Sequence, residues 1–193
     1  LPTARSQDRI PARSLQEIGD FAREAGSVDL ALKWTYNASC IGPLQDWDPV
    51  EDGKMLAALW DAGISRYIVT LPWLAAFTAR ILPKAEIEVS TIAGISSPKM
   101  FTDWCSLPGI RGICWDVMEN RNLGLLEKCL RIAEKMGMYV ELIANELCTY
   151  GCIYRQHCYN LSSHDSSRPG GYPFGQCVDV RNRKPWEWIE ARY

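Results

Sequence analysis

The stretch GIRGICWDVMENRNLGLLEKCLRIAEKMGMYVELI, residues 109–143, decides the fold of this chain. Residues 109–115 and 138–143 are apolar runs typical of buried strands. Between them, residues 122–136 carry apolar side chains at helical spacing, and Gly137 ends this predicted helix. The apolar stripe comprises Leu123, Leu126, Leu130 and Ala133, broadened by Cys129 and Met136. A strand, a helix and a strand in this order predict a βαβ unit with parallel strands.

The same alternation extends back to the start of the chain. A capping box at Ser14-x-x-Glu17 begins a predicted helix over 14–25, and Asp48-Pro49 begins the next, which stops at Gly63. Further helices are predicted over 72–82 and from Ser97-Pro98, and strands over 28–36, 66–70 and 86–91. Together these give five strands with four helices between them and one in front, which argues for a parallel sheet with right-handed crossovers.

The predicted fold class is therefore α/β, a parallel (β/α) barrel of TIM type that is incomplete, with about five β/α units. Five strands do not close an eight-stranded barrel, so the sheet is open or the chain is a piece of a longer one. The chain begins in a polar loop and does not end in a polar tail, which favours a piece of a longer chain. Residues 1–193 are expected to form one partial barrel domain with a cysteine-rich metal loop at 145–177.

Bulk composition excludes several classes of protein. The chain is 47% hydrophobic and 23% charged, without a signature of disorder, and its net charge of −2 gives no general basic field for nucleic acid. No apolar run approaches the roughly 20 residues of a membrane span, and no signal peptide is visible. We expect a cytoplasmic protein.

The segment after the last predicted strand is rich in metal-binding residue types. It holds both histidines, His157 and His164, and half of the eight cysteines, namely Cys148, Cys152, Cys158 and Cys177. Soft thiolates suit iron–sulfur clusters or zinc, and the spacing does not choose between them. The alternative is four buried or disulfide-linked cysteines. The other cysteines are scattered in or beside apolar stretches, which favours reduced thiols.

These residues resemble the collagenase-like peptidases, family thirty-two among peptidases of unknown catalytic type. The resemblance covers nearly the whole chain from about Ser6. The matching stretches, in the family's order, are Tyr36-Asn37-Ala38-Ser39-Cys40, Val89-Ser90-Thr91, Asn120-Arg121, Asn145-Glu146-x-Cys148 and Cys152-x-x-Arg155-x-His157.

The resemblance implies a β/α barrel of which this chain matches strands three to seven. It further implies a longer parent chain, or a homo- or heterodimer partner that completes the barrel. Some members are iron–sulfur proteins that hydroxylate RNA or the ubiquinone ring without using molecular oxygen. Cys148, Cys152 and Cys177 match family cysteines that hold a 4Fe-4S cluster, and the fourth ligand is Cys158 or Cys40. Zinc remains the alternative metal.

Six further residues are predicted to serve the reaction. Glu146 lies beside the thiolates in the sequence and suits a general acid or base. The alternative is a structural role, as a salt-bridge partner of Arg155. His157 is flanked by cysteines, and Arg155 could grip a carboxylate or phosphate. We take these three as catalytic candidates. The substrate-binding candidates are Asn37, Arg121 and Asn145.

Three functions are open at this point. The first is an iron–sulfur protein that hydroxylates or modifies RNA or a small aromatic substrate. The second is a peptidase, although the chain has no H-E-x-x-H helix or G-x-S-x-G elbow. The third is a non-catalytic thiolate–metal module of a heterodimer.

Overall fold

The computed structural model describes residues 3, 13–41, 47–144, 148 and 150–167. Within them, five strands form one sheet in the order β1-β2-β3-β4-β5, and every neighbouring pair is parallel. The strands are β1 (Lys33–Tyr36), β2 (Arg66–Val69), β3 (Glu86–Val89), β4 (Ile110–Cys114) and β5 (Tyr139–Glu141). Chain order and spatial order coincide, as they do in a β/α barrel.

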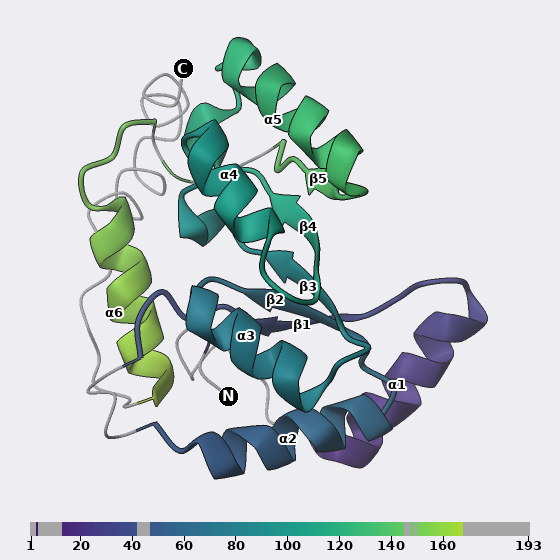
Figure 1. The fold of residues 1–193 in the computed structure, drawn as a ribbon. Coiled ribbons are helices and arrows are strands. Elements are labelled where there is room, and N and C mark those ends of the chain that lie inside the picture. Colours follow the sequence, from purple (N-terminus) through teal and green to yellow (C-terminus); the bar gives the residue numbers. More distant parts are fainter. Residues whose placement is uncertain (1–2, 4–12, 42–46, 145–147, 149, 168–193) are drawn as a thin grey trace.

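Helices follow the strands in regular alternation. They are α1 (Leu15–Ser27), α2 (Pro49–Asp61), α3 (Pro72–Ile81), α4 (Pro98–Cys105), α5 (Leu123–Met136) and α6 (Arg155–Ser167), with short 3₁₀ turns η3 (Thr91–Ala93) and η4 (Val117–Glu119). Helices α2 to α5 lie along the outer face of the sheet, whereas α6 stands apart from them (Figure 1). None of the described helices is both long enough and apolar enough to span a membrane.

Local capping explains where several helices begin and end. The Ser14–Glu17 capping box is formed at α1, and the Asp48 side chain accepts hydrogen bonds from the first turn of α2. Ser97 and Asn122 cap α4 and α5 in the same way, and Gly137 ends α5 in the left-handed conformation at φ 65°. A residue with a Cβ is strained there, so glycine fixes the end of the helix.

The core lies between the sheet and the helix layer. Tyr67 and Val69 on β2 and Ile87 and Val89 on β3 have no exposed surface. They pack in one cluster with helix residues such as Leu56, Leu59, Leu74 and Phe101. Alternate strand residues point to the other face, as the two-residue period of a strand requires.

Charged residues on that other face show that the sheet is curled. Lys33 Nζ, on the first strand, lies 2.7 Å from Glu88 Oε2 on the third and 2.5 Å from Glu141 Oε2 on the fifth. In a flat sheet β1 and β5 would be about 19 Å apart, which exceeds the combined reach of the two side chains. The side chains of both edges therefore meet across a concave interior. This geometry, with the strand order, supports the predicted incomplete barrel.

The described strands are shorter than predicted at the two edges of the sheet. The first strand was predicted over 28–36, but β1 begins only at Lys33. Residues 28–32 are not extended into the strand, because Asp29 adopts a left-handed φ of 60° and Leu30 N–H donates to Ala25 O at the end of α1. The last strand, predicted to be buried, has Tyr139 and Glu141 exposed. It is the edge strand of the described sheet, so one side lacks a neighbour.

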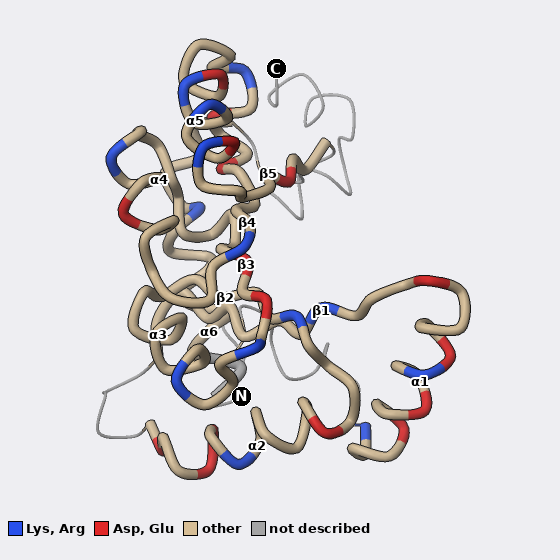
Figure 2. Tube along the Cα trace, turned by 45° about the vertical axis from the view of Figure 1, so that its right-hand side comes forward, with Lys and Arg blue, Asp and Glu red and all other residues tan. Residues whose placement is uncertain are grey.

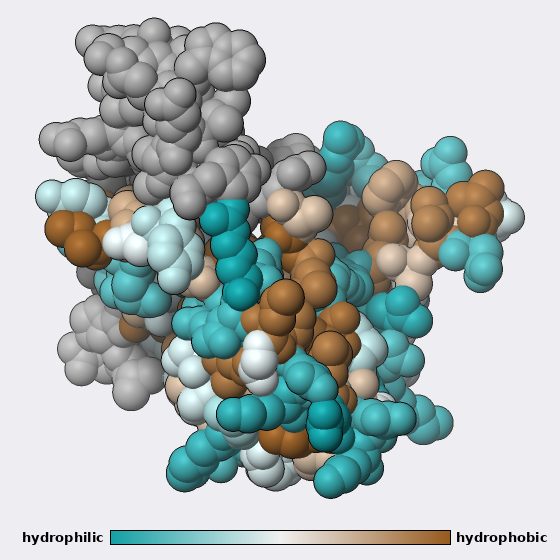
Figure 3. Space-filling view, turned by 90° about the horizontal axis from the view of Figure 1, so that it is seen from above, coloured by the Kyte–Doolittle hydropathy of each residue, from teal (hydrophilic) through white to brown (hydrophobic). Residues whose placement is uncertain are grey.

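The predicted apolar stripe of α5 is only partly buried. Leu126, Cys129 and Ala133 face the core, whereas Leu123 is 69% exposed and Leu130 45%. Viewed from above, apolar side chains lie in the open over the region of α5 (Figure 3). The prediction was wrong for Leu123, Leu130 and Met136, since within the described residues α5 packs mainly against α4, β5 and η4. Acidic and basic residues are interspersed on α1, α2, α4 and α5 (Figure 2).

Candidate functional site at the carboxyl end of the sheet

Helix α6 covers the end of the sheet toward which the strands point. Part of the predicted loop 145–177 is thus helical, over Arg155–Ser167. The segment is mostly polar and has no apolar period, which is why sequence reasoning missed the helix. Its first turn contacts residues that follow β3 and β4, and its second half contacts residues that follow β1. In a β/α barrel this end carries the active site.

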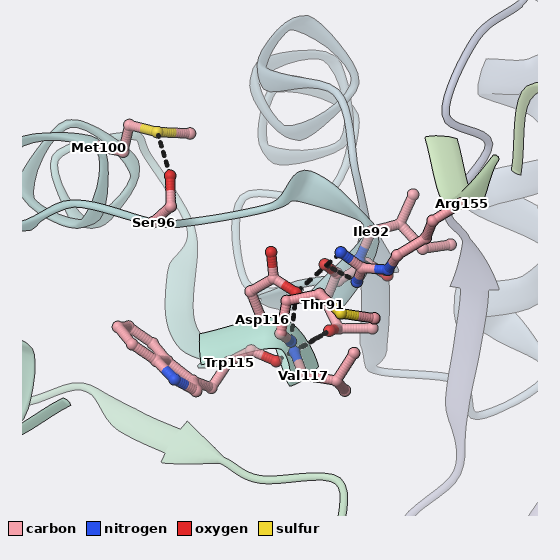
Figure 4. Close-up of polar contacts among 10 residues, drawn as sticks. Thr91, Ile92, Ser96, Met100, Trp115, Asp116, Val117 and Arg155 are labelled. Atoms are coloured by element: carbon pink, nitrogen blue, oxygen red, sulfur yellow. Dashed lines mark hydrogen bonds and ion pairs between the residues drawn. The ribbon is translucent and has the colours of Figure 1, made fainter. Parts of the chain in front are cut away.

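Arg155 anchors the start of α6 through a buried ion pair. Its Nη1 lies 2.9 Å from Asp116 Oδ1, and the two side chains are only 13% and 8% exposed. Its Nη2 donates to Thr91 O at 3.4 Å, and its guanidinium lies 5.3 Å from the ring centre of Tyr159. Figure 4 shows Arg155 reaching between the segments that follow β3 and β4. Arg155 therefore pairs with Asp116, a partner that the sequence did not suggest, whereas its suggested partner Glu146 lies outside the described residues.

The charge of Arg155 is retained despite burial. Burial opposes it, but Tyr159, Asp116 and Cys148 together raise the pKa of the guanidinium. Its Nε atom is buried without a hydrogen-bond partner. The guanidinium thus stays charged within the predicted metal loop, and the Asp116 carboxylate balances that charge.

Thr91 and Asp116 also order the segment after β4. Thr91 Oγ1 donates to Trp115 O at 2.8 Å and accepts from Val117 N–H at 3.3 Å, while Asp116 Oδ1 accepts from Met118 N–H at 3.0 Å. These bonds hold the Asp116 carboxylate in place for Arg155 (Figure 4). The sequence placed Thr91 and Asp116 at strand ends, but it could not pair either of them with Arg155.

The second half of α6 docks on the segment after β1. Ser39 Oγ donates to Asn160 Oδ1 at 2.7 Å, and Ser39 N–H donates to Ser163 Oγ at 2.9 Å. The next residue, Cys40, has its Sγ 3.3 Å from His164 Nε2. Asn160 and Ser163 were not predicted as site residues, because their role depends on the docking of α6.

The described loop cysteines come shortly before α6 or lie in its first turn. Cys148, Cys152 and Cys158 are half-buried, and Arg155 N–H donates to Cys152 O at 3.2 Å. Cys148 lies close enough to influence the charge of Arg155. The positive end of a helix and a neighbouring guanidinium both favour the thiolate form of cysteine. No disulfide joins any of the seven described cysteines, and Cys177 lies outside the described residues.

The cysteines of the fold interior differ from those of the loop. Cys105, Cys114 and Cys129 are buried, and burial raises the pKa of Cys105 and Cys114 to about 11. Such thiols stay protonated at neutral pH and act as small core side chains.

The remaining predicted site residues are more dispersed. Asn37 follows β1 and accepts a hydrogen bond from Thr3 Oγ1 at 3.0 Å, which uses one of its amide oxygen positions. His157 is exposed on α6, and Arg121 is exposed in the turn before α5. Asn145 and Glu146 lie outside the described residues. Of these residues, Asn37 lies at the carboxyl end of the sheet, the end that also contacts α6.

In the described part of the chain, three potential metal ligands come within 4.8 Å of one another only at Glu88, Cys114 and Glu141. This group lies on the concave face, and the Lys33 ammonium already contacts both carboxylates. Tyr139 OH also donates to Glu88 Oε2 at 2.8 Å. An ammonium balances the acidic charge there, so the group forms a structural network.

Comparison with known proteins identifies the fold. No protein-family model matches the chain, and no curated protein matches it. A solved structure titled "The Structure of the U32 Peptidase Mk0906" matches 91% of this chain and 69% of its own, with a TM-score of 0.71 and 18% sequence identity. Likeness at that identity is a statement about fold. The chain therefore shares the parallel α/β architecture of a U32 peptidase.

Proposed function

We propose that the chain is an iron–sulfur protein whose loop thiolates hold a cluster at the mouth of the partial barrel. The cluster would serve oxygen-independent hydroxylation or a related modification of RNA or a small aromatic substrate. The observation that carries the proposal is that Cys148, Cys152 and Cys158 are half-buried free thiols shortly before α6 and in its first turn, with Cys148 near enough to Arg155 to affect its charge. The substrate class rests on the sequence resemblance.

Electrostatics supports thiolate ligation at this place. A thiolate-bound iron–sulfur centre is anionic, and its potential depends on nearby charge and hydrogen bonds. The α6 amino terminus supplies positive potential there, and Arg155 adds hydrogen-bond donors, although Asp116 balances its charge. Cys148, Cys152, Cys158 and Cys177 would be the four ligands.

The choice of a cluster over zinc rests on the sequence resemblance, because the spacing of the cysteines along the chain suits either metal. Within the described residues, the three loop cysteines do not form a group within 4.8 Å.

The position of Cys40 favours Cys158 as the fourth ligand. Cys40 Sγ lies 3.6 Å from Asn160 O and 3.3 Å from His164 Nε2, and these residues come five and nine positions after Arg155, or about 7 and 14 Å along the helix axis. Cys158 lies within one turn of Arg155. The thiols near the helix start therefore include Cys158 and leave out Cys40.

Anaerobic purification tests the proposal. We expect a brown protein that contains iron and acid-labile sulfide in equal amounts, about four of each per chain. Cys148→Ser and Cys152→Ser should each lower the iron content severalfold. The matched control, Cys40→Ser, should keep it.

Two results would contradict the cluster. One is colourless protein with stoichiometric zinc, which would support a structural metal module. The other is full iron content in Cys148→Ser. Peptide hydrolysis, the activity named for the structural neighbour, makes a different prediction, because cleavage should then survive Cys148→Ala.

A further inference from the structure

We propose that Cys40 and His164 form a thiol–imidazole centre for acyl transfer, separate from the thiolate group at the start of α6. Cys40 would be the nucleophile and His164 its general base, and the substrate would be a carboxylic ester. The proposal goes beyond the cluster function and uses none of its ligands.

The contact itself has the geometry of an activated nucleophile. Cys40 Sγ lies 3.3 Å from His164 Nε2, and the two residues are 124 positions apart in the chain. Nucleophile and base side chains within hydrogen-bond reach are the structural signature of covalent catalysis. A cysteine and a histidine that are distant in sequence and adjacent in space fit the usual arrangement of such pairs.

Independent hydrogen bonds hold the two elements that carry the pair. Ser39, next to Cys40, contacts Asn160 and Ser163 on the turn of α6 before His164. Ser163 Oγ also donates to Tyr159 O at 2.8 Å within the helix. The thiol and the imidazole thus project from a docked interface, which limits their relative motion and preserves the contact.

The location agrees with an active site. Cys40 follows β1 at the carboxyl end of the sheet, where β/α barrels carry their catalytic residues. Both side chains are half-buried, so part of each remains accessible to a small substrate.

The surroundings of Cys40 determine how the base must act. Burial raises the pKa of the thiol, although a hydrogen bond from Ser39 opposes this. A protonated resting thiol needs a base that removes its proton during attack. His164 Nε2 is placed to accept it when the ring proton is on Nδ1.

The reaction can be written with its atoms in balance. Cys40 Sγ bonds to the acyl carbon as its proton passes to His164 Nε2, and the bond to the leaving group then breaks. An alcohol leaving group takes the proton from His164, whereas a phenolate leaves without it and His164 then releases the proton to water. Water next attacks the thioester and gives a proton to the neutral imidazole of His164. The carbon–sulfur bond breaks, and the departing thiolate takes that proton back.

Acetylation by p-nitrophenyl acetate tests the assignment on the full chain. We expect a burst of p-nitrophenolate and an acetyl group on Cys40, located by peptide mass spectrometry. Cys40→Ser should remove the burst. His164→Gln should slow acetylation of Cys40 by about 100-fold or more, the lower range for loss of a general base.

Chemical rescue separates a base from a structural contact. After subtraction of the ester hydrolysis by imidazole alone, free imidazole should restore much of the rate of Cys40 acetylation in His164→Ala and leave that of the parent protein unchanged. Gln156→Ala is the matched control, because Gln156 lies on α6 and contacts Asn160 without touching the thiol. It should acetylate at the parental rate.

The assignment would be overturned if Cys40 of the parent protein is not acetylated. It would also be overturned if His164→Gln reacts as fast as the parent, or if imidazole gives no rescue. Circular dichroism of each variant checks that α6 and the sheet remain folded. Iron content is measured in parallel, so that failure of this centre and failure of the cluster are distinguished.

Discussion

At the scale of single residues, the ion pair between Arg155 and Asp116 is the principal tie between α6 and the sheet. Both side chains are largely removed from water, so loss of one partner leaves a buried charge without compensation. We expect Asp116→Ala to lower the free energy of unfolding by about 3 kcal/mol in urea titrations.

The exposed pair of Glu127 and Arg131 on α5 is the control for that prediction. Glu127→Ala should cost less than about 0.5 kcal/mol, because water screens an exposed pair. Equal losses in the two variants would show that Asp116 does not hold α6 in place.

At the scale of elements, β4 and β5 fit together through a glycine. A Cβ on Gly112 would lie 2.2 Å from the ring of Tyr139, which is its register partner on β5. The close approach lets the Tyr139 hydroxyl reach Glu88 on β3. Gly112→Ala should therefore displace the ring and cost about 1–3 kcal/mol of unfolding free energy.

A double-mutant cycle checks this cause. In a Tyr139→Ala background, the ring is absent, so Gly112→Ala should cost much less than it does alone. Gly124→Ala is the control, since nothing lies within 4 Å of its added Cβ and alanine favours the helix. An unchanged cost in the double mutant would show that the ring contact is not responsible.

At the scale of the whole molecule, Lys33 links the two edges of the curled sheet. It contacts Glu88, which is 3% exposed, and Glu141 on the last strand. Lys33→Ala leaves Glu88 with less charge compensation in the interior. We expect a loss of about 3 kcal/mol in thermal or urea unfolding, within the range for one partner of a buried pair.

The pair of Arg66 and Glu86 on neighbouring strands serves as the comparison, because both side chains are partly exposed. Arg66→Ala should cost less than about 1 kcal/mol. If Lys33→Ala is equally mild, the curvature does not depend on this contact. Glu88→Gln combined with Lys33→Ala should recover part of the loss, since it removes the unpaired charge.

Local chemistry explains how much of the fold could be predicted. Caps at Ser14, Asp48, Ser97 and Asn122 act within a few residues of themselves, and each begins a helix where expected. The order of strands and helices follows from such signals and from apolar periodicity, so the α/β class was confirmed. The edges were less predictable, because exposure of β5 and α5 depends on which neighbours are present.

The candidate site, too, could be predicted from the sequence only in part. The sequence by itself determined that cysteines, both histidines and Arg155 share one segment after the last strand, since that is a matter of residue type and spacing. Only the tertiary structure decided that Arg155 meets Asp116 and that Cys40 meets His164. The segment that docks, α6, is polar and carries no apolar period, so its place is set by contacts with residues far away in the chain.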